Sequence, residues 1–380
     1  MNALVEKLKS SLAPAPHASR VGPIGLHFAE EQVHAVQLRR LASGAYCLRA
    51  WASARYPDTR EDALESPARL QRVLSKLLSR GRFQGREVVT ALPPAMSRIT
   101  SLNYQVSGKT ADGEAILRLM ESRLEGPIGD YVIDFLPVRG DASSRDRVAL
   151  VATSRRSDVL KLLDDLHAAR LDVVELEVGP AAINRLISLL PRPENSRGNV
   201  LVINYGAEHT YITLISGRRL LMDKEIPFGA NALIKQIARS LDVTPAMAEE
   251  MAVREGLNQQ VNKPFGATVQ LTADDLNPLV EIVRPIFAPL AEEVRRACLY
   301  AASESQGEVV EQVYTVGSIA RWPGADQLLS EIARLPVATT LPLTAIFDTD
   351  DAADISSYPG IGPELATATG LALRGLMDDA

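Results

Sequence analysis

Two segments that lie far apart in the chain share one pattern of apolar and polar positions. Residues 24–38 read IGLHFAEEQVHAVQL, and residues 201–215 read LVINYGAEHTYITLI. Each begins with an apolar run, continues through a short polar turn and ends in a run where apolar residues alternate with polar ones. This pattern predicts a β-hairpin. The repeat predicts a duplicated α/β fold with two lobes that face each other across a cleft.

The first hairpin is predicted to open lobe 1, residues 21–94 and 155–192. Apolar residues at helical spacing after Pro67 predict a helix that ends at Gly81. The predicted elements are strands 22–28, 32–40 and 45–54, helix 67–80, strand 87–92, helix 156–170, strand 172–177 and helix 179–190. This order is typical of one lobe of an α/β fold.

Residues 95–154 interrupt lobe 1 with a pattern of their own. They predict a small inserted α+β module whose elements are strand 97–104, helix 111–126 and strands 130–139 and 146–155. After the return to lobe 1, residues 191–199 read PRPENSRGN. A stretch so rich in proline, glycine and asparagine is typical of a domain linker.

Lobe 2, residues 193–380, is predicted to repeat the three-strand start. Its predicted elements are strands 199–204, 209–215 and 218–226, helices 229–240 and 245–255, a helical tract at 273–304 interrupted by prolines 278, 285 and 289, strand 311–316 and helix 325–334. The last helix, 363–377, is rich in small residues and is predicted to pack closely on a sheet. Packing back onto lobe 1 is one option for it.

Residues 1–20 form an N-terminal tail. Leu4, Leu8 and Leu12 make a short helical stripe that two prolines end. We expect this tail to be flexible or loosely docked, with contact to a partner or to a membrane surface as the alternative.

Composition narrows the function classes. The chain has 380 residues, 46% hydrophobic and 23% charged, with a net charge of −6, so phosphate neutralisation on a nucleic acid has little support. No apolar run is long enough to span a bilayer and no signal peptide is evident, which favours the cytoplasm. Two cysteines without a motif suit a reducing compartment, and five scattered histidines lack metal-ligand spacing. No metal site is expected.

Facing hairpins in a duplicated fold are the plan of the actin-like, ribonuclease-H-like ATPases. Small residues in the two turns let backbone N–H groups approach the phosphates of ATP. Acidic side chains at the strand ends hold Mg²⁺ or orient water. The residues of the two turns therefore decide whether the cleft suits a nucleotide.

Four segments, in order along the chain, resemble the PilM family of type IV pilus assembly and its relatives in competence and mannose-sensitive (MSHA) pilus systems. They are HFAEEQVH at 27–34, EAILRLMESRLEGPIGDYVIDF at 114–135, INYGAEHT with IPFGAN at 203–231, and GSIARWPG at 317–324. The similarity runs from about residue 21 to the C-terminus. It implies an actin-like fold with the inserted module in lobe 1.

The first hairpin departs from the family pattern D-I-G-S-S-S-V-K. His27 replaces the aspartate that acts near Mg²⁺, and Ala29, Glu30 and Glu31 replace residues that cradle phosphate. A carboxylate facing a phosphate at ~4 Å costs about 4 kcal/mol at an effective dielectric of ~20. The simplest interpretation of Glu30 and Glu31 is that both are solvated charges at the hairpin tip. Asp223 and Glu225, on a later strand, are also expected to be exposed.

The second hairpin and a later helix also lack some of the residues with which the family would bind a nucleotide. Asn204 replaces the second aspartate, although Gly206 and Thr210 remain; Glu249 remains without the lysine that follows in the family. The candidate residues of a degenerate nucleotide cleft are His27, Glu31, Asn204, Gly206, Thr210, Glu249 and Gly317. The alternative is that the polar ones serve the turns and that the glycines serve backbone geometry.

Three functions from different classes remain. The first is a cytoplasmic adaptor at the inner membrane, a pseudo-ATPase that needs no cofactor. The resemblance implies that it binds the N-terminal tail of a PilN-like membrane protein in a groove between lobe 1 and the module. The candidate groove residues, whose alternative role is core packing, are Leu92, Pro93, Ile99, Leu117, Met120 and Leu124.

The second function is a switch in which ATP and Mg²⁺ close the lobes and tune affinity for the tail. The third is a sugar- or phosphate-transferring enzyme, which neither hairpin supports, because both lack the acidic base and the acidic metal ligand. Other pilus platform proteins are expected partners, nucleic acid is not, and the membrane is reached only through partners. The sequence leaves open whether the protein forms homo-oligomers.

Overall fold

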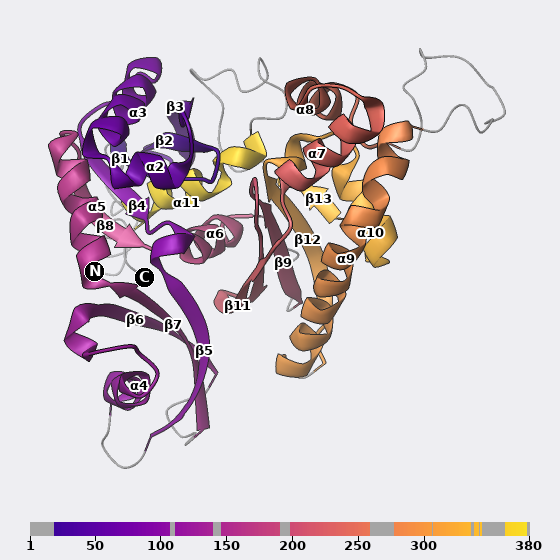
Figure 1. Cartoon of the computed structure of the whole chain (residues 1–380). Coiled ribbons are helices and arrows are strands. Elements are labelled where there is room, and N and C mark those ends of the chain that lie inside the picture. The colour runs from indigo at the N-terminus through magenta and orange to yellow at the C-terminus, as the bar shows by residue number, and fades with distance from the viewer. Residues whose placement is uncertain are drawn as a thin grey trace, which may run out of the picture.

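The computed structural model describes residues 19–106, 111–139, 146–190, 198–258, 277–305, 307–335, 338–341, 343 and 362–377. Residues 1–18 of the predicted tail and 191–197 of the predicted linker lie outside this part of the chain. Two large sheets stand side by side, and a smaller third sheet lies below the first one in Figure 1.

The first sheet contains the first hairpin. Its strand order is β3-β2-β1-β4-β8, with β1 to β3 antiparallel and β4 and β8 parallel to β1. The strands are β1 (Arg20–Phe28), β2 (Gln32–Arg40), β3 (Tyr46–Arg55), β4 (Glu87–Ala91) and β8 (Asp172–Glu177). The helices are α2 (Arg60–Glu65), α3 (Pro67–Arg80), α5 (Arg156–Ala168) and α6 (Gly179–Ser188). Helix α2 was not predicted; Thr59 caps it by accepting the Asp62 N–H.

The second sheet repeats this topology. Its order is β11-β10-β9-β12-β13, again three antiparallel strands followed by two parallel ones. The strands are β9 (Asn199–Tyr205), β10 (Thr210–Ser216), β11 (Arg219–Ile226), β12 (Val310–Gly317) and β13 (Ala338–Thr340). The helices are α7 (Ala230–Leu241), α8 (Pro245–Arg254), α9 (Pro278–Glu304) and α10 (Ala325–Ala333). The predicted duplicated two-lobe α/β fold is thereby confirmed, whereas the exact domain boundaries stay a prediction.

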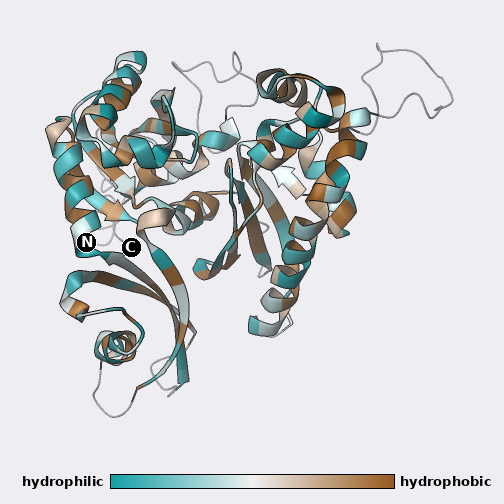
Figure 2. Ribbon diagram, viewed as in Figure 1, coloured by the Kyte–Doolittle hydropathy of each residue, from teal (hydrophilic) through white to brown (hydrophobic). Residues whose placement is uncertain are grey.

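The third sheet belongs to the inserted module. Its antiparallel strands are β5 (Arg98–Gln105), β7 (Asp146–Arg155) and β6 (Tyr131–Arg139), in that order, and helix α4 (Asp112–Glu121) packs with one face of it. Val138, Val148 and Leu150 point to the other face, where they join the core around the second sheet. In Figure 2 hydrophobic residues follow the strands of the second sheet and the side of α9 that faces it.

The prolines do not interrupt helix α9, contrary to the sequence-based expectation. Pro285 and Pro289 lie inside one continuous helix of 27 residues. Each proline removes an N–H donor and frees a carbonyl one turn earlier. Both prolines are on the exposed face, where water can bind the freed carbonyls, while Phe287 and Leu290 anchor the opposite face in the core.

The last helix lies on the first sheet. Helix α11 (Ala366–Arg374), preceded by a 3₁₀ turn at Gly362–Leu365, packs against β1, β4 and α6 (Figure 1). A Cβ on Gly25 would stand 2.0 Å from the carbonyl oxygen of Ala368, so glycine is required for this close approach. The C-terminal end of the chain thus contributes to the core of lobe 1.

Candidate functional site between the two hairpins

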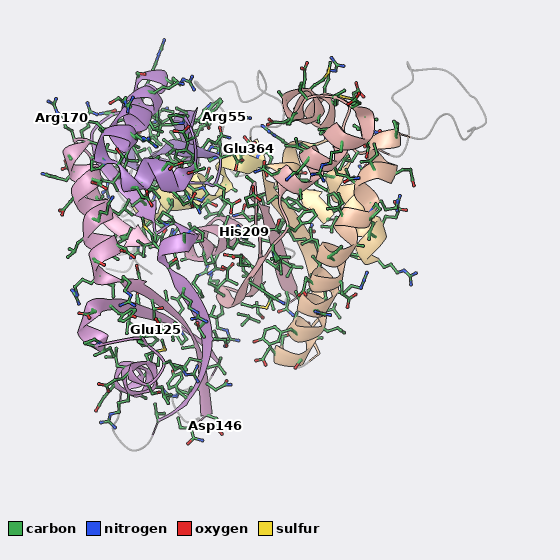
Figure 3. All side chains as sticks on the ribbon, viewed as in Figure 1. Arg55, Glu125, Asp146, Arg170, His209 and Glu364 are labelled. Atoms are coloured by element: carbon green, nitrogen blue, oxygen red, sulfur yellow. The ribbon has the colours of Figure 1, made fainter. Side chains whose placement is uncertain are left out.

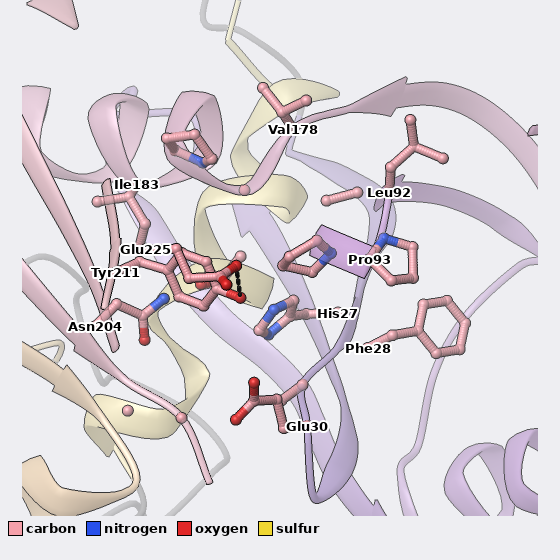
Figure 4. Close-up of a pocket in the computed structure, with 18 of the residues that line it drawn as sticks. His27, Phe28, Glu30, Leu92, Pro93, Val178, Ile183, Asn204, Tyr211 and Glu225 are labelled. Carbon is pink, nitrogen blue, oxygen red and sulfur yellow. Dashed lines mark hydrogen bonds between the residues drawn. The ribbon is translucent and has the colours of Figure 1, made fainter. Parts of the chain in front are cut away.

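A cavity of about 290 Å³ lies between the first and the second hairpin. One wall is apolar and comes from the end of β4, the start of β5 and the start of α6; Leu92, Pro93 and Ile183 are among its residues (Figure 4). The polar part of the lining comes from the first hairpin and from strands β9 to β11. The carboxylates that line the cavity are Glu30, Glu31, Asp223, Glu225 and Glu364.

Two histidines from the first hairpin stand at the cavity as neutral rings. His27 and His34 are partners across β1 and β2, and their rings stack with centroids 6.2 Å apart. Burial lowers the pKa of each to about 3. His34 Nδ1 contacts Ser53 Oγ at 2.8 Å, while His27 Nδ1 is buried without a partner in the described residues. The position where the fold places a metal-binding aspartate therefore carries no charge.

Glu30 is not a solvated charge at the hairpin tip, contrary to the sequence-based expectation. Its Oε2 atom accepts hydrogen bonds from the backbone N–H groups of Glu208, at 2.6 Å, and His209, at 3.2 Å. Its Oε1 atom lies 2.8 Å from His209 Nδ1, and its side chain is 11% exposed. The reason is the facing turn, which offers N–H donors to an anion.

Glu31 is likewise not solvated. Burial raises its pKa, and its Oε2 atom has no hydrogen-bond partner in the described residues. Burial also raises the pKa of Glu364 to about 7, although Arg321 Nη1 lies 3.0 Å from its carboxylate. Arg321 and Arg55 both donate to Glu249 Oε1, at 2.6 and 2.8 Å. These ion pairs connect β3, α8 and the 3₁₀ turn at Gly362–Leu365. Figure 3 labels Arg55 and Glu364 at this side of the cleft.

Asp223 and Glu225 face the cavity from β11, and the sequence did not indicate this role. Burial raises the pKa of Asp223 to about 6, and Thr213 Oγ1 donates to it at 2.6 Å. The hydroxyl of Tyr211 donates to Glu225 at 3.1 Å, the dashed line of Figure 4. Their alternation shows that both side chains share one face of the strand. Nothing in the local sequence shows that this face meets the cleft, so the expected exposure of Asp223 is wrong.

The structure brings together most of the predicted nucleotide residues. His27, Glu31, Asn204, Gly206 and Gly317 all line the cavity. Gly317 has φ +86°, and a Cβ on it would meet the Tyr205 carbonyl oxygen at 2.1 Å, so backbone geometry alone requires glycine there.

Two predicted nucleotide residues lie outside the cavity lining. Thr210 is fully buried and donates to the carbonyl of Phe228 at 2.7 Å. Glu249, on helix α8, forms ion pairs with Arg55 and Arg321.

The six predicted groove residues do not form one groove. Leu92, Pro93 and Ile99 line the cavity. On α4, by contrast, Met120 is buried in the module core, Leu124 packs against that core, and Leu117 is 44% exposed. Strand β5 turns its even-numbered Leu102 and Tyr104 toward α4. Ile99 therefore points to the opposite face of the sheet from the α4 residues, because side chains alternate along a strand.

The chemistry of the cavity lining does not suit Mg²⁺ and a triphosphate. Glu30 already occupies N–H donors of the second turn, His27 is neutral, and the guanidinium of Arg60, a cation of the lining, is hydrogen-bonded to Glu61. Within the described residues no group of three or more His, Cys, Asp or Glu could hold a metal ion. The side chains present do not fit a magnesium-bound triphosphate. Among the helices that the structure describes, none has the length and apolarity to cross a membrane.

Two sheets of matching topology with a cleft between their hairpins define the class of the protein as the actin-like ATPase fold. Residues 25–376 match the family described as "Type IV pilus assembly protein PilM". The chain therefore belongs to the PilM family, as its sequence motifs indicated; assignment to the MSHA branch stays a prediction.

One solved structure supports this fold over nearly the whole chain. A PilM–PilN type IV pilus biogenesis complex matches with a TM-score of 0.74 at 24% identity, covering 94% of this chain and 100% of that chain. More distant similarity extends to the ethanolamine utilization protein EutJ from Carboxydothermus hydrogenoformans (TM-score 0.49, 15% identity, 98% and 99% covered). It also extends to MreB5 of Spiroplasma citri bound to ADP (TM-score 0.49, 12% identity, 93% and 95% covered).

Proposed function

We propose that this protein is a scaffold of a type IV pilus assembly platform and that it binds the cytoplasmic N-terminal tail of a PilN-like inner-membrane protein. The match to the PilM family over residues 25–376 carries the proposal. The similar fold of a chain solved as part of a PilM–PilN complex supports it. In this function the protein works at the cytoplasmic face of the inner membrane and reaches the membrane through its partner.

The docking place that the geometry favours is the apolar wall of the cavity next to β5. Leu92, Pro93 and Ile99 offer an apolar surface there. Strand β5 is an edge strand of the third sheet, so one row of its N–H and C=O groups has no strand partner within that sheet. An extended peptide can add to such an edge through its backbone while alternate side chains enter the apolar wall. Helix α4 is a less suitable site because Met120 is already committed to the module core.

A nucleotide-dependent switch is the second candidate, and the enclosed cavity at the position of the ATPase cleft favours it. The charges oppose it, since the lining is rich in carboxylates and a polyphosphate would be repelled. We rank the scaffold first for this reason. A transferase activity has no support, because the first hairpin offers a neutral His27 where an acidic group is needed.

The proposal is tested by titrating the whole chain with a synthetic peptide that copies the N-terminus of the PilN-like protein of the same organism. We expect saturable binding by calorimetry and a rise in melting temperature with peptide concentration. A scrambled peptide of the same composition is the control. Absence of binding at saturating peptide would contradict the proposal.

Two matched variants locate the site. Ile99→Asp places a charge on the apolar wall, and Leu117→Asp places the same charge on the exposed face of α4. We expect Ile99→Asp to abolish peptide binding and Leu117→Asp to leave it unchanged. The reverse result would move the site to α4 and contradict the proposed wall.

A further inference from the structure

We propose that Glu30 is a tethered anion, which occupies the position on the second hairpin where this fold would hold a phosphate group and thereby joins the two hairpins directly. The contact would set the ligand selectivity of the cleft. It does not rest on the proposed pilus partner and holds whichever protein binds elsewhere on the chain.

The contacts of Glu30 are those of a bound anion. Successive backbone N–H groups, from Glu208 and His209, converge on one carboxylate oxygen. The ring nitrogen Nδ1 of His209 lies against the other oxygen. Successive N–H groups in a turn form a concave site for anions, and this is how phosphate is held in many loops. Glu30 fills that site from the facing hairpin, across a separation of 178 residues.

The second turn is shaped around this carboxylate. A Cβ on Gly206 would stand 2.6 Å from Glu30 Oε2 and 2.6 Å from the carbonyl oxygen of His209, so the glycine leaves room both for the incoming anion and for the backbone of the turn. Glu208, in the same turn, does not compete for the site, because its carboxylate accepts from Asn231 Nδ2 at 2.7 Å. The N–H donors of the turn therefore bind the carboxylate of Glu30, while the carboxylate of Glu208 binds Asn231.

Occupation by Glu30 has a direct consequence for ligands. A phosphate and a carboxylate cannot share the same N–H donors, and at such short range they repel each other. Glu31, Asp223 and Glu225 line the same cavity, and its carboxylates outnumber its two arginines, Arg60 and Arg98. The cleft therefore excludes polyanions, and the hairpins stay in contact without a nucleotide between them.

The test compares Glu30→Ala with Glu208→Ala in the full-length chain. Both variants remove one carboxylate from the facing turns, but only the first empties the N–H site. The probe is inorganic pyrophosphate, and calorimetry is the readout. We expect the wild type and Glu208→Ala to bind no pyrophosphate at millimolar concentration, and Glu30→Ala to gain at least about tenfold in affinity. Equal affinity in the three proteins would overturn the proposal.

Hydrogen exchange provides a second readout, and the outcome that decides it needs the wild type alone. The amides of Glu208 and His209 sit in a surface turn, where exchange is ordinarily fast. Because Glu30 accepts from both, we expect slow exchange at these two amides in the wild type and faster exchange in Glu30→Ala. Fast exchange of both amides in the wild type would overturn the proposal.

Discussion

The two hairpins have the same backbone plan and opposite chemistry. In each, the strand before the turn pairs antiparallel with the strand after it, with His27 opposite His34 and Asn204 opposite Tyr211. The first turn supplies an acceptor, Glu30, and the second supplies the N–H donors. In an ATPase both turns present donors to one shared ligand. Here the first turn supplies the ligand of the second turn. The two repeats have the same backbone shape, but one provides the acceptor and the other the donors of a single contact.

The strands behind the turns differ as well. Gly25 in β1 and Val202 in β9 hold equivalent positions in the two repeats. Gly25 lies directly under helix α11, whose backbone would collide with any side chain there. Val202 is fully buried in the core of the second sheet. The first sheet is therefore covered by a helix in close backbone contact, while the second is covered by side-chain packing.

The largest expected effect on the free energy of unfolding comes from disturbing the close contact between the first sheet and α11. Gly25→Val would place a branched side chain against the backbone of α11, and we expect a loss of about 3 kcal/mol or more in the free energy of unfolding. Val202→Ala removes two methyl groups from the second core and should cost about 2 kcal/mol. Denaturant unfolding of both variants provides the comparison. A smaller loss for Gly25→Val than for Val202→Ala would contradict the account of α11.

The next effect concerns the contact between the hairpins. Glu30→Ala leaves the N–H groups of Glu208 and His209 without their charged acceptor, so we expect a loss of about 1.5–3 kcal/mol in the free energy of unfolding. Glu208→Ala should cost less than about 1 kcal/mol, because its bond to Asn231 is at an exposed position. Equal costs, measured by denaturant unfolding, would show that the contact between the hairpins stabilises the protein no more than an exposed hydrogen bond does.

A pH-dependent effect is expected from Asp223 on β11 of the second sheet. The pKa of Asp223 is about 6 in the folded protein against an ordinary value of 3.8, so the folded state binds its proton more tightly. The free energy of unfolding contributed by this group therefore falls as pH rises from about 4 through 6. Asp223→Asn keeps an acceptor for Thr213 but cannot ionise. Above this window it should be more stable than the wild type by on the order of 1–2 kcal/mol, and the difference should vanish at about pH 4.

Glu225→Gln is the control, since that side chain is on the same strand but is 52% exposed. We expect it to change the pH profile of thermal unfolding less than Asp223→Asn does, because the charge of Glu225 is the smallest of the causes that act on the pKa of Asp223. An Asp223→Asn profile parallel to that of the wild type would contradict the raised pKa of this partly buried carboxyl.

The smallest effect belongs to the second contact across the cleft. Arg55 reaches from β3 to Glu249 on α8, but its side chain is 61% exposed. Exposed ion pairs contribute about 0.2–1 kcal/mol and are screened by salt. We expect Arg55→Gln to lower the free energy of unfolding within that range at low salt and to have no effect at high salt. A loss as large as that of Glu30→Ala would reverse the ranking of the two contacts.

The sequence predicted those parts of the fold that depend on local pattern. The alternation in 24–38 and 201–215 was sufficient for both hairpins and for the duplication, and the family motifs pointed to the PilM family. It could not predict the role of Glu30, because the donors that bind this residue belong to a turn 178 residues away. A charged residue at a hairpin tip is ordinarily solvated, and only the facing lobe changes that.

The other errors have the same origin. The alternation in β5 puts Ile99 and Leu102 on opposite faces, but only the packing of α4 shows which of the two faces this helix covers. The alternation in β11 pairs Asp223 with Glu225 without showing that their face meets the cleft. In α9, proline is a local signal for a helix break, and tertiary packing of Phe287 overrides it. Local pattern predicts an element and its two faces; the partner of each face is a long-range property.

Calorimetric titration of the wild-type chain with ATP and Mg²⁺ tests the central claim most directly. If the two hairpins bind each other through Glu30, no heat of binding is expected at millimolar ATP, and the melting temperature should not change. Micromolar binding with a rise in melting temperature would show that the cleft still holds a nucleotide, and would contradict the account.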